Sequence, residues 1–224
     1  MKKTMISLIL VMIMLFISSS VLAFGLKLPG KKKVSDSAVS LDDTIKEQGD
    51  LVKIYEKALK LDQDANFMLV EAIKGKEKAD QYREQAKGVT SGNCNSDYIK
   101  KKVKITKEAH EESAKCSAKV GELSTESKEK VGESMILMAE SVICYKQAAT
   151  KSKTCLDNAK SVVKSAPMTK KLSVKKKLDP VLTIGPKMPG SLVEAGKTLK
   201  NLVAFAKSNK IKVPQKATQA LGEL

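Results

Sequence analysis

Four cysteines are the residues of this 224-residue chain whose spacing most constrains its chemistry. None of them forms a Cys-x-x-Cys or Cys-x-x-Cys-His motif, so the sequence does not support a redox dithiol or a covalently attached haem. A four-cysteine zinc site is an alternative, but zinc ligands usually come as close pairs and the nearest spacing here is eleven residues. In an exported protein, an even number of cysteines predicts two disulfides. The four residues are Cys94, Cys116, Cys144 and Cys155.

Helical geometry restricts how these cysteines can pair. Cys144 and Cys155 fall in one predicted helix and lie roughly 16 Å apart along its axis, whereas a disulfide requires Cα atoms within about 7 Å. Each must therefore reach the segment that contains Cys94 and Cys116, or another molecule. We expect the pairs Cys94–Cys155 and Cys116–Cys144, because the crossed pairing fits an antiparallel helix register less well.

The single histidine, His110, is the other candidate for chemistry. It lies beside Glu108, Glu111 and Glu112, and we expect a solvated side chain on an exposed helix face. The sequence contains no His-Glu-x-x-His, Gly-x-Ser-x-Gly or phosphate-binding glycine motif. Acidic residues alternate with lysines, which indicates surface ion pairs rather than an acid–base couple. We therefore predict a non-enzymatic protein without cofactor or metal; an enzyme or cofactor carrier with a site in a helical core is the alternative.

The N-terminus predicts export. Met1–Thr4 is positively charged, and Met5–Ile17 is an almost continuous apolar run. Val21 and Ala23 fit the positions that signal peptidase recognises, so we predict a Sec-type signal peptide that is cleaved after Ala23. An uncleaved membrane anchor is the alternative, but the apolar run is short for a bilayer span. The expected location is the periplasm or the exterior of the cell.

The charge of the chain is strongly unbalanced, with 41 basic and 25 acidic residues and a formal net charge of +16. Residues 167–224 hold 12 basic and 3 acidic side chains, and so carry most of the excess. Such a segment attracts anionic phospholipid headgroups or an anionic envelope polymer. The lysines that we assign to anionic-surface binding are Lys170, Lys171, Lys175, Lys176, Lys177, Lys187, Lys197, Lys200, Lys207, Lys210 and Lys212.

Two other interpretations of this basic segment remain. In one, the amphipathic stretch at 191–208 closes a helical core and the lysines only keep the protein soluble. Nucleic acid is not expected, because Phe205 is the segment's only aromatic residue and a base-stacking platform is lacking.

The elements that would position these residues are predicted to be helices. Apolar residues recur at three- and four-residue steps over about 41–87 and predict one long helix. Ser40 or Asp42 would cap its N-terminus, and Gly49 and Gly75 are weak points within it.

Further helices are expected over about 97–120 and around 131–163, the latter with a coiled-coil-like seam and a cap at Ser124 or Thr125. The stretch at 191–208 is amphipathic, and 215–222 could add a final turn or two. Four of the six prolines fall within 166–190, which predicts a linker or irregular wrap.

We therefore predict an all-α fold, an elongated antiparallel three- or four-helix bundle with coiled-coil-like seams, stapled by disulfides and followed by a basic irregular C-terminal segment. A coiled-coil homo-oligomer is the rival. The expected organisation begins with a signal peptide (1–23) and a basic flexible arm (24–40). A bundle core (41–166), a Pro/Lys-rich linker (167–190) and an amphipathic helix with tail (191–224) follow.

This organisation predicts an interaction protein of the bacterial cell envelope, a scaffold, adaptor or chaperone-like binder with a protein partner or self-association. The alternative function is a basic protein of the membrane or envelope surface that binds anionic lipid or polymer through its C-terminal segment.

Overall fold

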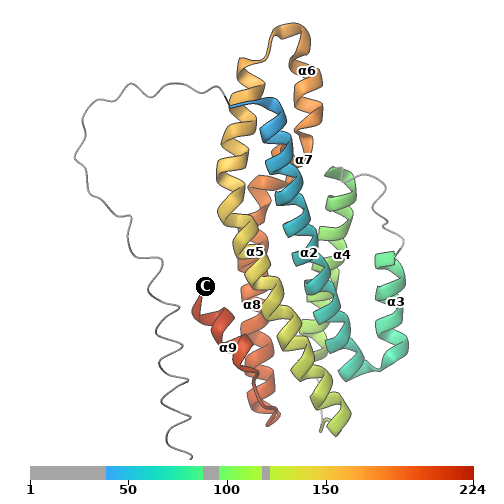
Figure 1. Ribbon diagram of the computed structural model, residues 1–224. Coiled ribbons are helices and arrows are strands. Elements are labelled where there is room, and N and C mark those ends of the chain that lie inside the picture. Colours follow the sequence, from blue (N-terminus) through green and yellow to red (C-terminus); the bar gives the residue numbers. More distant parts are fainter. Residues whose placement is uncertain (1–38, 88–95, 118–121) are drawn as a thin grey trace, which may run out of the picture. The chain divides into compact units, whose positions relative to one another are not determined.

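The computed structural model describes residues 39–87, 96–117 and 122–224, and these residues belong to one compact unit (Figure 1). Within these ranges the regular structure is entirely helical, and the helices pack together. The all-α prediction is confirmed. The predicted signal peptide and nearly all of the predicted basic arm lie outside the described residues.

Two long helices, α2 (Leu41–Lys74) and α5 (Thr125–Ser165), make the most extensive contact between any two described helices. Their N-termini are capped as the sequence predicts. The hydroxyl oxygen of Ser40 accepts a hydrogen bond from the Asp43 N–H at 3.1 Å, and that of Ser124 accepts one at 3.1 Å in α5. Each cap supplies an acceptor for a backbone N–H that has no partner within its helix.

Small residues bring α2 and α5 close together. The Ser141 hydroxyl donates to the Ala58 carbonyl oxygen at 3.0 Å, and the Ser134 hydroxyl donates to the Ala65 carbonyl oxygen at 2.7 Å. All four residues are fully buried. A short side chain can reach the backbone of the neighbouring helix only where the two axes approach closely, so these contacts fix the register of α2 against α5.

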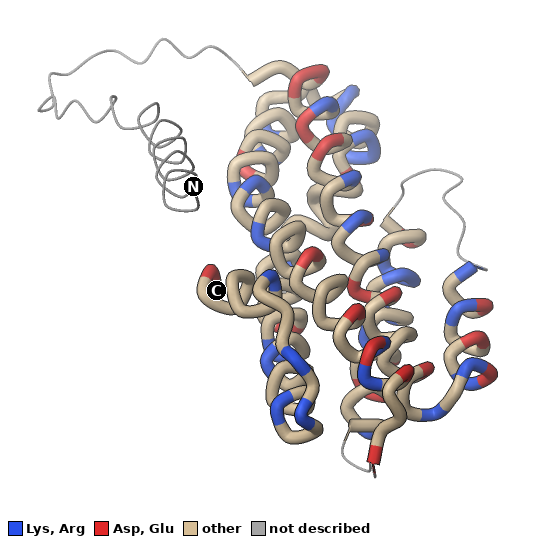
Figure 2. Tube along the Cα trace, turned by 60° about the horizontal axis from the view of Figure 1, so that its bottom comes forward, with Lys and Arg blue, Asp and Glu red and all other residues tan. Residues whose placement is uncertain are grey.

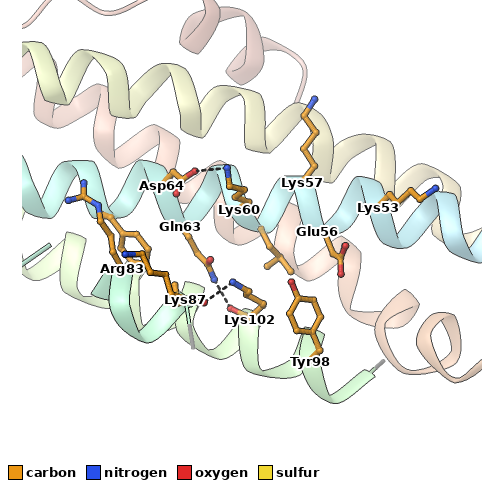
Figure 3. Close-up of a pocket in the computed structure, with 13 residues that line it drawn as sticks. Lys53, Glu56, Lys57, Lys60, Gln63, Asp64, Arg83, Lys87, Tyr98 and Lys102 are labelled. Carbon is orange, nitrogen blue, oxygen red and sulfur yellow. Dashed lines mark hydrogen bonds and ion pairs between the residues drawn. The ribbon is translucent and has the colours of Figure 1, made fainter. Parts of the chain in front are cut away.

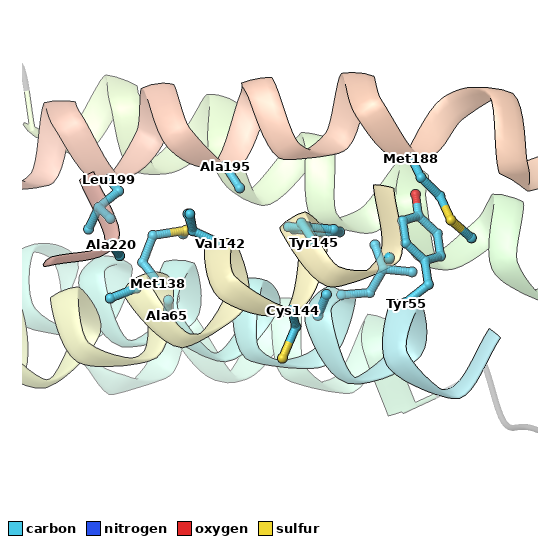
Figure 4. Close-up of a cluster of buried hydrophobic side chains, with 14 of the residues drawn as sticks. Tyr55, Ala65, Met138, Val142, Cys144, Tyr145, Met188, Ala195, Leu199 and Ala220 are labelled. Atoms are coloured by element: carbon cyan, nitrogen blue, oxygen red, sulfur yellow. The ribbon is translucent and has the colours of Figure 1, made fainter. Parts of the chain in front are cut away.

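The helix α8 (Met188–Ser208) packs against α5, the helix that also packs against α2. Its buried residues include Ala195, which lies opposite Val142 and Tyr145 of α5, and Leu199, which lies nearer Met138 (Figure 4). The amphipathic stretch at 191–208 therefore belongs to a packed helix, and its apolar face is covered. The last helix, α9 (Gln215–Gly222), also packs against α5.

The first correction to the predicted helices concerns Gly75. There α2 ends and a separate helix, α3 (Lys76–Lys87), begins and turns back along α2 (Figure 1). Gly75 has φ +88°, in the left-handed region that glycine adopts without a steric penalty. The prediction of one continuous helix over 41–87 is therefore wrong.

This reversal sets the direction of α4 (Ser96–Ser117), which runs parallel to α2. The pairing shows this directly, because Gln63 of α2 donates to Thr106 and Lys74 donates to Glu112. The helices α3 and α4 thus both pack against α2 (Figure 1), and α4 also contacts α7 (Asp179–Ile184) and α8.

The second correction concerns residues 167–190, which are helical rather than irregular. They form α6 (Met168–Lys177), α7 (Asp179–Ile184) and a 3-10 turn, η1 (Gly185–Lys187), that leads into α8. Each proline of this region is the N-cap or second residue of a helical element, where the missing N–H breaks no helical hydrogen bond. These prolines are Pro167, Pro180, Pro186 and Pro189.

The third correction concerns the disulfides. Cys116, Cys144 and Cys155 are all buried and no two of them are joined by a disulfide, so the predicted Cys116–Cys144 bond is not formed. Burial raises the pKa of each of the three thiols, that of Cys155 to about 11. Cys94 lies outside the described residues, and its pairing with Cys155 stays a prediction.

The helix register explains why Cys116 and Cys144 do not meet. Cys116 packs against Val70 of α2. Cys144 lies one turn from Ser141, whose hydroxyl contacts Ala58. Val70 and Ala58 are separated by roughly 18 Å along α2, well beyond the Cα distance of about 7 Å that a disulfide allows.

Candidate functional site

All the lysines that the sequence assigns to anionic-surface binding are exposed, but the structure divides them between two settings. One group lies on α6, and the other lies on η1, on α8 and in the connection to α9. Figure 2 shows these basic positions along the chain. In chain order the α6 group is Lys170, Lys171, Lys175, Lys176 and Lys177, and the second group is Lys187, Lys197, Lys200, Lys207, Lys210 and Lys212.

The first group belongs to a segment that we call the α6 tip, residues 164–177. It holds six lysines and no acidic residue. Nearly all of its side chains are exposed, and Val174 is its one buried residue. Leu178, immediately after the helix, is fully buried. The α6 tip is therefore anchored at its C-terminal end, and the rest of its surface faces solvent.

Two large apolar side chains on the α6 tip are exposed. Met168 is 86% exposed and Leu172 is 67% exposed, the two highest values among the six exposed large apolar residues of the described ranges. Because they are four residues apart in a helix, they lie on the same face. Helical spacing places Lys175 and Lys176 on the two sides of this pair. The arrangement is an apolar ridge flanked by ammonium groups.

The second group of lysines has different surroundings. Most of the apolar residues of α8 pack into the core, and Leu199 and Leu202 are buried there. Lys197, Lys200 and Lys207 point to solvent from the remaining surface. Of the large apolar residues on α8, Val193 is exposed, at 54%, without a second exposed apolar residue one turn away.

Acidic residues at the start of α2 lie at the same end of the molecule as the α6 tip. The Gln48 amide donates to the Lys177 carbonyl oxygen at 3.0 Å, and its oxygen accepts from the Val181 N–H at 3.1 Å. This contact fixes the first turns of α2 beside the α6–α7 junction, and red positions lie near the blue ones there in Figure 2. The acids on those turns are Asp42, Asp43 and Glu47.

His110 occupies a different kind of site from the one that we predicted. Its side chain is only 14% exposed, and its Nε2 lies 2.5 Å from Oδ1 of Asp62, which is itself buried. The Tyr145 hydroxyl donates to the other carboxylate oxygen at 3.1 Å, and the Asn66 amide donates to Oδ1 at 2.9 Å. The prediction of a solvated histidine is therefore wrong, and α2, α4 and α5 meet at one buried carboxylate.

The electrostatics of this network follow from burial and from the carboxylate. Burial lowers the pKa of His110, but the charge and hydrogen bond of Asp62 outweigh burial and leave that pKa raised. Burial raises the pKa of Tyr145 well above its ordinary value, and Asp62 adds to the effect. The arrangement favours a protonated imidazole next to a carboxylate, with a neutral phenol.

His110 also lies in the wall of a cavity of about 450 Å³ between α4 and α8. An imidazole held by a carboxylate is the arrangement of a general base, which would need a nucleophile within reach. Ser113 lines the same cavity, but its hydroxyl is directed to the Asn66 carbonyl oxygen at 3.4 Å. These contacts give the His110–Asp62 pair a structural role, because it links α4 to α2.

Within the described ranges, no group of three or more His, Cys, Asp or Glu side chains could hold a metal ion. None of the described helices has the length and apolar character that a bilayer crossing requires.

Comparison of the chain with protein-family models, with curated proteins and with solved structures found no match.

Proposed function

We propose that this chain is an exported, non-enzymatic helical protein of the bacterial cell envelope that binds an anionic membrane surface through the α6 tip. The observation that carries the proposal is the exposure of Met168 and Leu172 between lysines. An apolar ridge alone would suit many partners. Its flanking ammonium groups select a surface that is apolar below and negatively charged above, which is the interface of an anionic bilayer.

The charge of the α6 tip supplies attraction, and its apolar ridge supplies insertion. A lysine near an anionic surface contributes about 1 kcal/mol, and burying an exposed apolar side chain contributes about 1.5–3 kcal/mol when burial is complete. Lysine stems can also lie along the apolar region with their ammonium groups in the headgroup layer. The acids at the start of α2 reduce the electrostatic part, so we expect reversible binding that weakens with salt.

The finer architecture is part of the same proposal. We infer a four-helix bundle of α2, α4, α5 and α8 whose function is to hold the α6 tip at one end. The buried serine contacts between α2 and α5 support a close-packed bundle. The N-terminal sequence pattern supports export, which would bring the protein to a membrane surface.

The test is co-sedimentation of the chain from Phe24 onward, the mature form that the sequence predicts, with phosphatidylglycerol and with phosphatidylcholine vesicles. We expect binding to the anionic vesicles at low salt, release at high salt and little binding to the neutral vesicles. Replacing Lys175, Lys176 and Lys177 by Gln removes three charges from the α6 tip. At about 1 kcal/mol per lysine, this change should lower affinity by roughly a hundredfold.

The matched control replaces Lys197, Lys200 and Lys207 by Gln and removes the same number of charges from α8. We expect a loss of less than about threefold from this variant, because screening limits the reach of distant charges. Equal losses in the two variants would contradict the proposal, since net charge alone would then drive adsorption. Failure of the unmodified protein to bind anionic vesicles would also contradict it and would favour a protein partner.

A further inference from the structure

A groove between α2, α3 and α4 is the second feature with the properties of a binding site. Its volume is about 660 Å³, within the range of roughly 300–1,000 Å³ that is typical of small-molecule sites. It exists because the chain reverses at Gly75 and brings α3 back alongside α2. Figure 3 shows the side chains that line it.

The floor of the groove is apolar. Leu59 and Phe67 of α2 and Ala86 of α3 contribute to it, and each is buried to more than nine-tenths. Phe67 is stacked on Tyr82 of α3, with ring centroids 6.2 Å apart, so its ring is held in place. Tyr98 of α4 lines the end of the groove. Because the three floor residues are already covered by the protein, the apolar surface that a ligand can still cover is the ring of Tyr98 and the alkyl stems of the lining lysines.

The rim of the groove is basic. Six basic side chains and two acidic side chains line it. Three of these bases are already paired, since Arg83 contacts Glu71 and Asp80, Lys60 contacts Asp64, and Lys87 contacts Glu84. The attraction for an anion therefore comes from the other three lysines of the rim. The basic residues are Lys53, Lys57, Lys60, Arg83, Lys87 and Lys102, and the acidic residues are Glu56 and Asp64.

Lys102 is the ammonium group that an anion would use best. It points toward the centre of the groove, whereas Lys57 points away from it (Figure 3). Its Nζ donates to the neutral carbonyl oxygen of Ala86 at 3.0 Å. Burial lowers the pKa of Lys102, and the charges of Asp64 and Glu56 only partly oppose this effect. A bound anion would return to this partly dehydrated cation the interaction that it lost with water.

We propose that the groove binds a long-chain carboxylate, with the carboxylate on Lys102 and the alkyl chain along the ring of Tyr98 and the alkyl stems of the lining lysines. A small inorganic anion would leave this apolar surface uncovered. A neutral lipid would leave the basic rim unused. The long-chain carboxylate satisfies both parts of the site, and this inference does not depend on the α6 tip.

The test is a calorimetric titration of the protein with three probes: laurate below its micelle concentration, dodecanol and acetate. We expect laurate to bind, dodecanol to bind at least about tenfold more weakly because it lacks the charge, and acetate to show no measurable binding. Equal affinities for laurate and dodecanol would overturn the proposal, because the basic rim would then play no part. A failure of laurate to bind would overturn it as well.

A pair of variants on α4 locates the carboxylate. Lys102→Gln should lower laurate affinity by about tenfold or more, whereas Lys102→Arg should retain most of it. The matched control is Lys104→Gln on the same helix, because the Lys104 side chain is 79% exposed and does not line the groove. Circular dichroism would verify that all three variants fold. Equal affinities of Lys102→Gln and Lys104→Gln for laurate would show that the site lies elsewhere.

The same variants separate this inference from the proposed function. Replacement of Lys175, Lys176 and Lys177 should leave laurate affinity unchanged, and Lys102→Gln should leave vesicle affinity unchanged. Loss of laurate binding in the α6 tip variant would place the carboxylate on the α6 tip and overturn the groove assignment.

Discussion

The helices α6 and α8 are both lysine-rich and both carry apolar residues, yet they present opposite surfaces. In α8 the apolar residues repeat over a long helix and are buried against α5, as Leu199 illustrates. In α6 the helix is short, Val174 and the following Leu178 are enough to anchor it, and Met168 and Leu172 remain outside. The comparison teaches that basic charge alone does not distinguish a binding surface from a solubilising one. The distinguishing feature is apolar surface that the fold leaves exposed.

The largest predicted effect separates the two helices by stability. Leu199→Ala should lower the free energy of unfolding by about 3 kcal/mol, because it leaves a cavity between α8 and α5. Leu172→Ala should change that free energy by less than about 0.5 kcal/mol, because the side chain is solvated in the folded protein. Urea unfolding followed by circular dichroism measures both values. Similar losses in the two variants would mean that α6 packs as α8 does.

The next effect separates the two helices by membrane affinity. Replacing Met168 and Leu172 together by Ser should weaken binding to phosphatidylglycerol vesicles by about tenfold, because the apolar contribution is lost while every lysine remains. Val193→Ser on α8 is the control and should leave vesicle affinity unchanged. Both proteins should keep the stability of the unmodified chain. Unaltered vesicle affinity in the α6 variant would show that the α6 tip binds through its charges alone.

A smaller effect is the pH dependence of stability, which should come from the buried His110 and not from the α6 tip. The pKa of His110 is raised in the folded protein, so the stabilisation from its protonated form is complete below about pH 6.5 and is lost as pH rises through the folded-state pKa. The free energy of unfolding should therefore decrease as the pH is raised from about 6 to about 7.5. His110→Gln should be less stable at the lower pH and should lose most of this dependence.

Urea unfolding of both proteins across that interval checks the prediction. The interval ends at about pH 7.5 so that titration of the buried thiols contributes little, because an ordinary unfolded-state thiol ionises near about pH 8.5. The replacement of Met168 and Leu172 by Ser should retain the full pH dependence and serves as the control. A pH dependence that persists in His110→Gln would assign the effect to another group.

The helices with regular apolar spacing were predictable from the sequence, and Gly75 shows the limit of that method. The alanines after Gly75, such as Ala79 and Ala86, continue the stripe of α2. A straight helix and a folded-back helix bury such residues equally well, so periodicity alone cannot distinguish them. The backbone decides, because glycine allows the positive φ at which the chain reverses. The groove between α2, α3 and α4 was missed for this reason.

The burial of His110 was hidden by its polar neighbours. The buried face of α4 includes Thr106 and Ser113, which do not register as an apolar stripe. Asp62 and Asn66, four residues apart within the apolar stripe of α2, were the available signal that a polar network crosses the core. Pattern reading favours apolar positions, so a core that is tied together by hydrogen bonds is underestimated.

The α6 tip was predictable in part. Its lysines were assigned from charge, but the prolines around it suggested irregular structure because a proline interrupts a helix interior. The same residues also suit the first turn of a helix, and Pro167 and Pro180 occupy such positions. The exposure of Met168 and Leu172 depends on which side of α6 packs, and only the three-dimensional arrangement determines this.

The most direct test of the central claim uses the absence of tryptophan from the chain. Leu172→Trp places a single tryptophan on the α6 tip, and Val193→Trp places one on the exposed surface of α8. Addition of phosphatidylglycerol vesicles should shift the emission of Leu172→Trp to shorter wavelength and make it quenchable by brominated lipid, while Val193→Trp stays unchanged. Equal responses from the two positions, or no response from Leu172→Trp, would contradict membrane binding through the α6 tip.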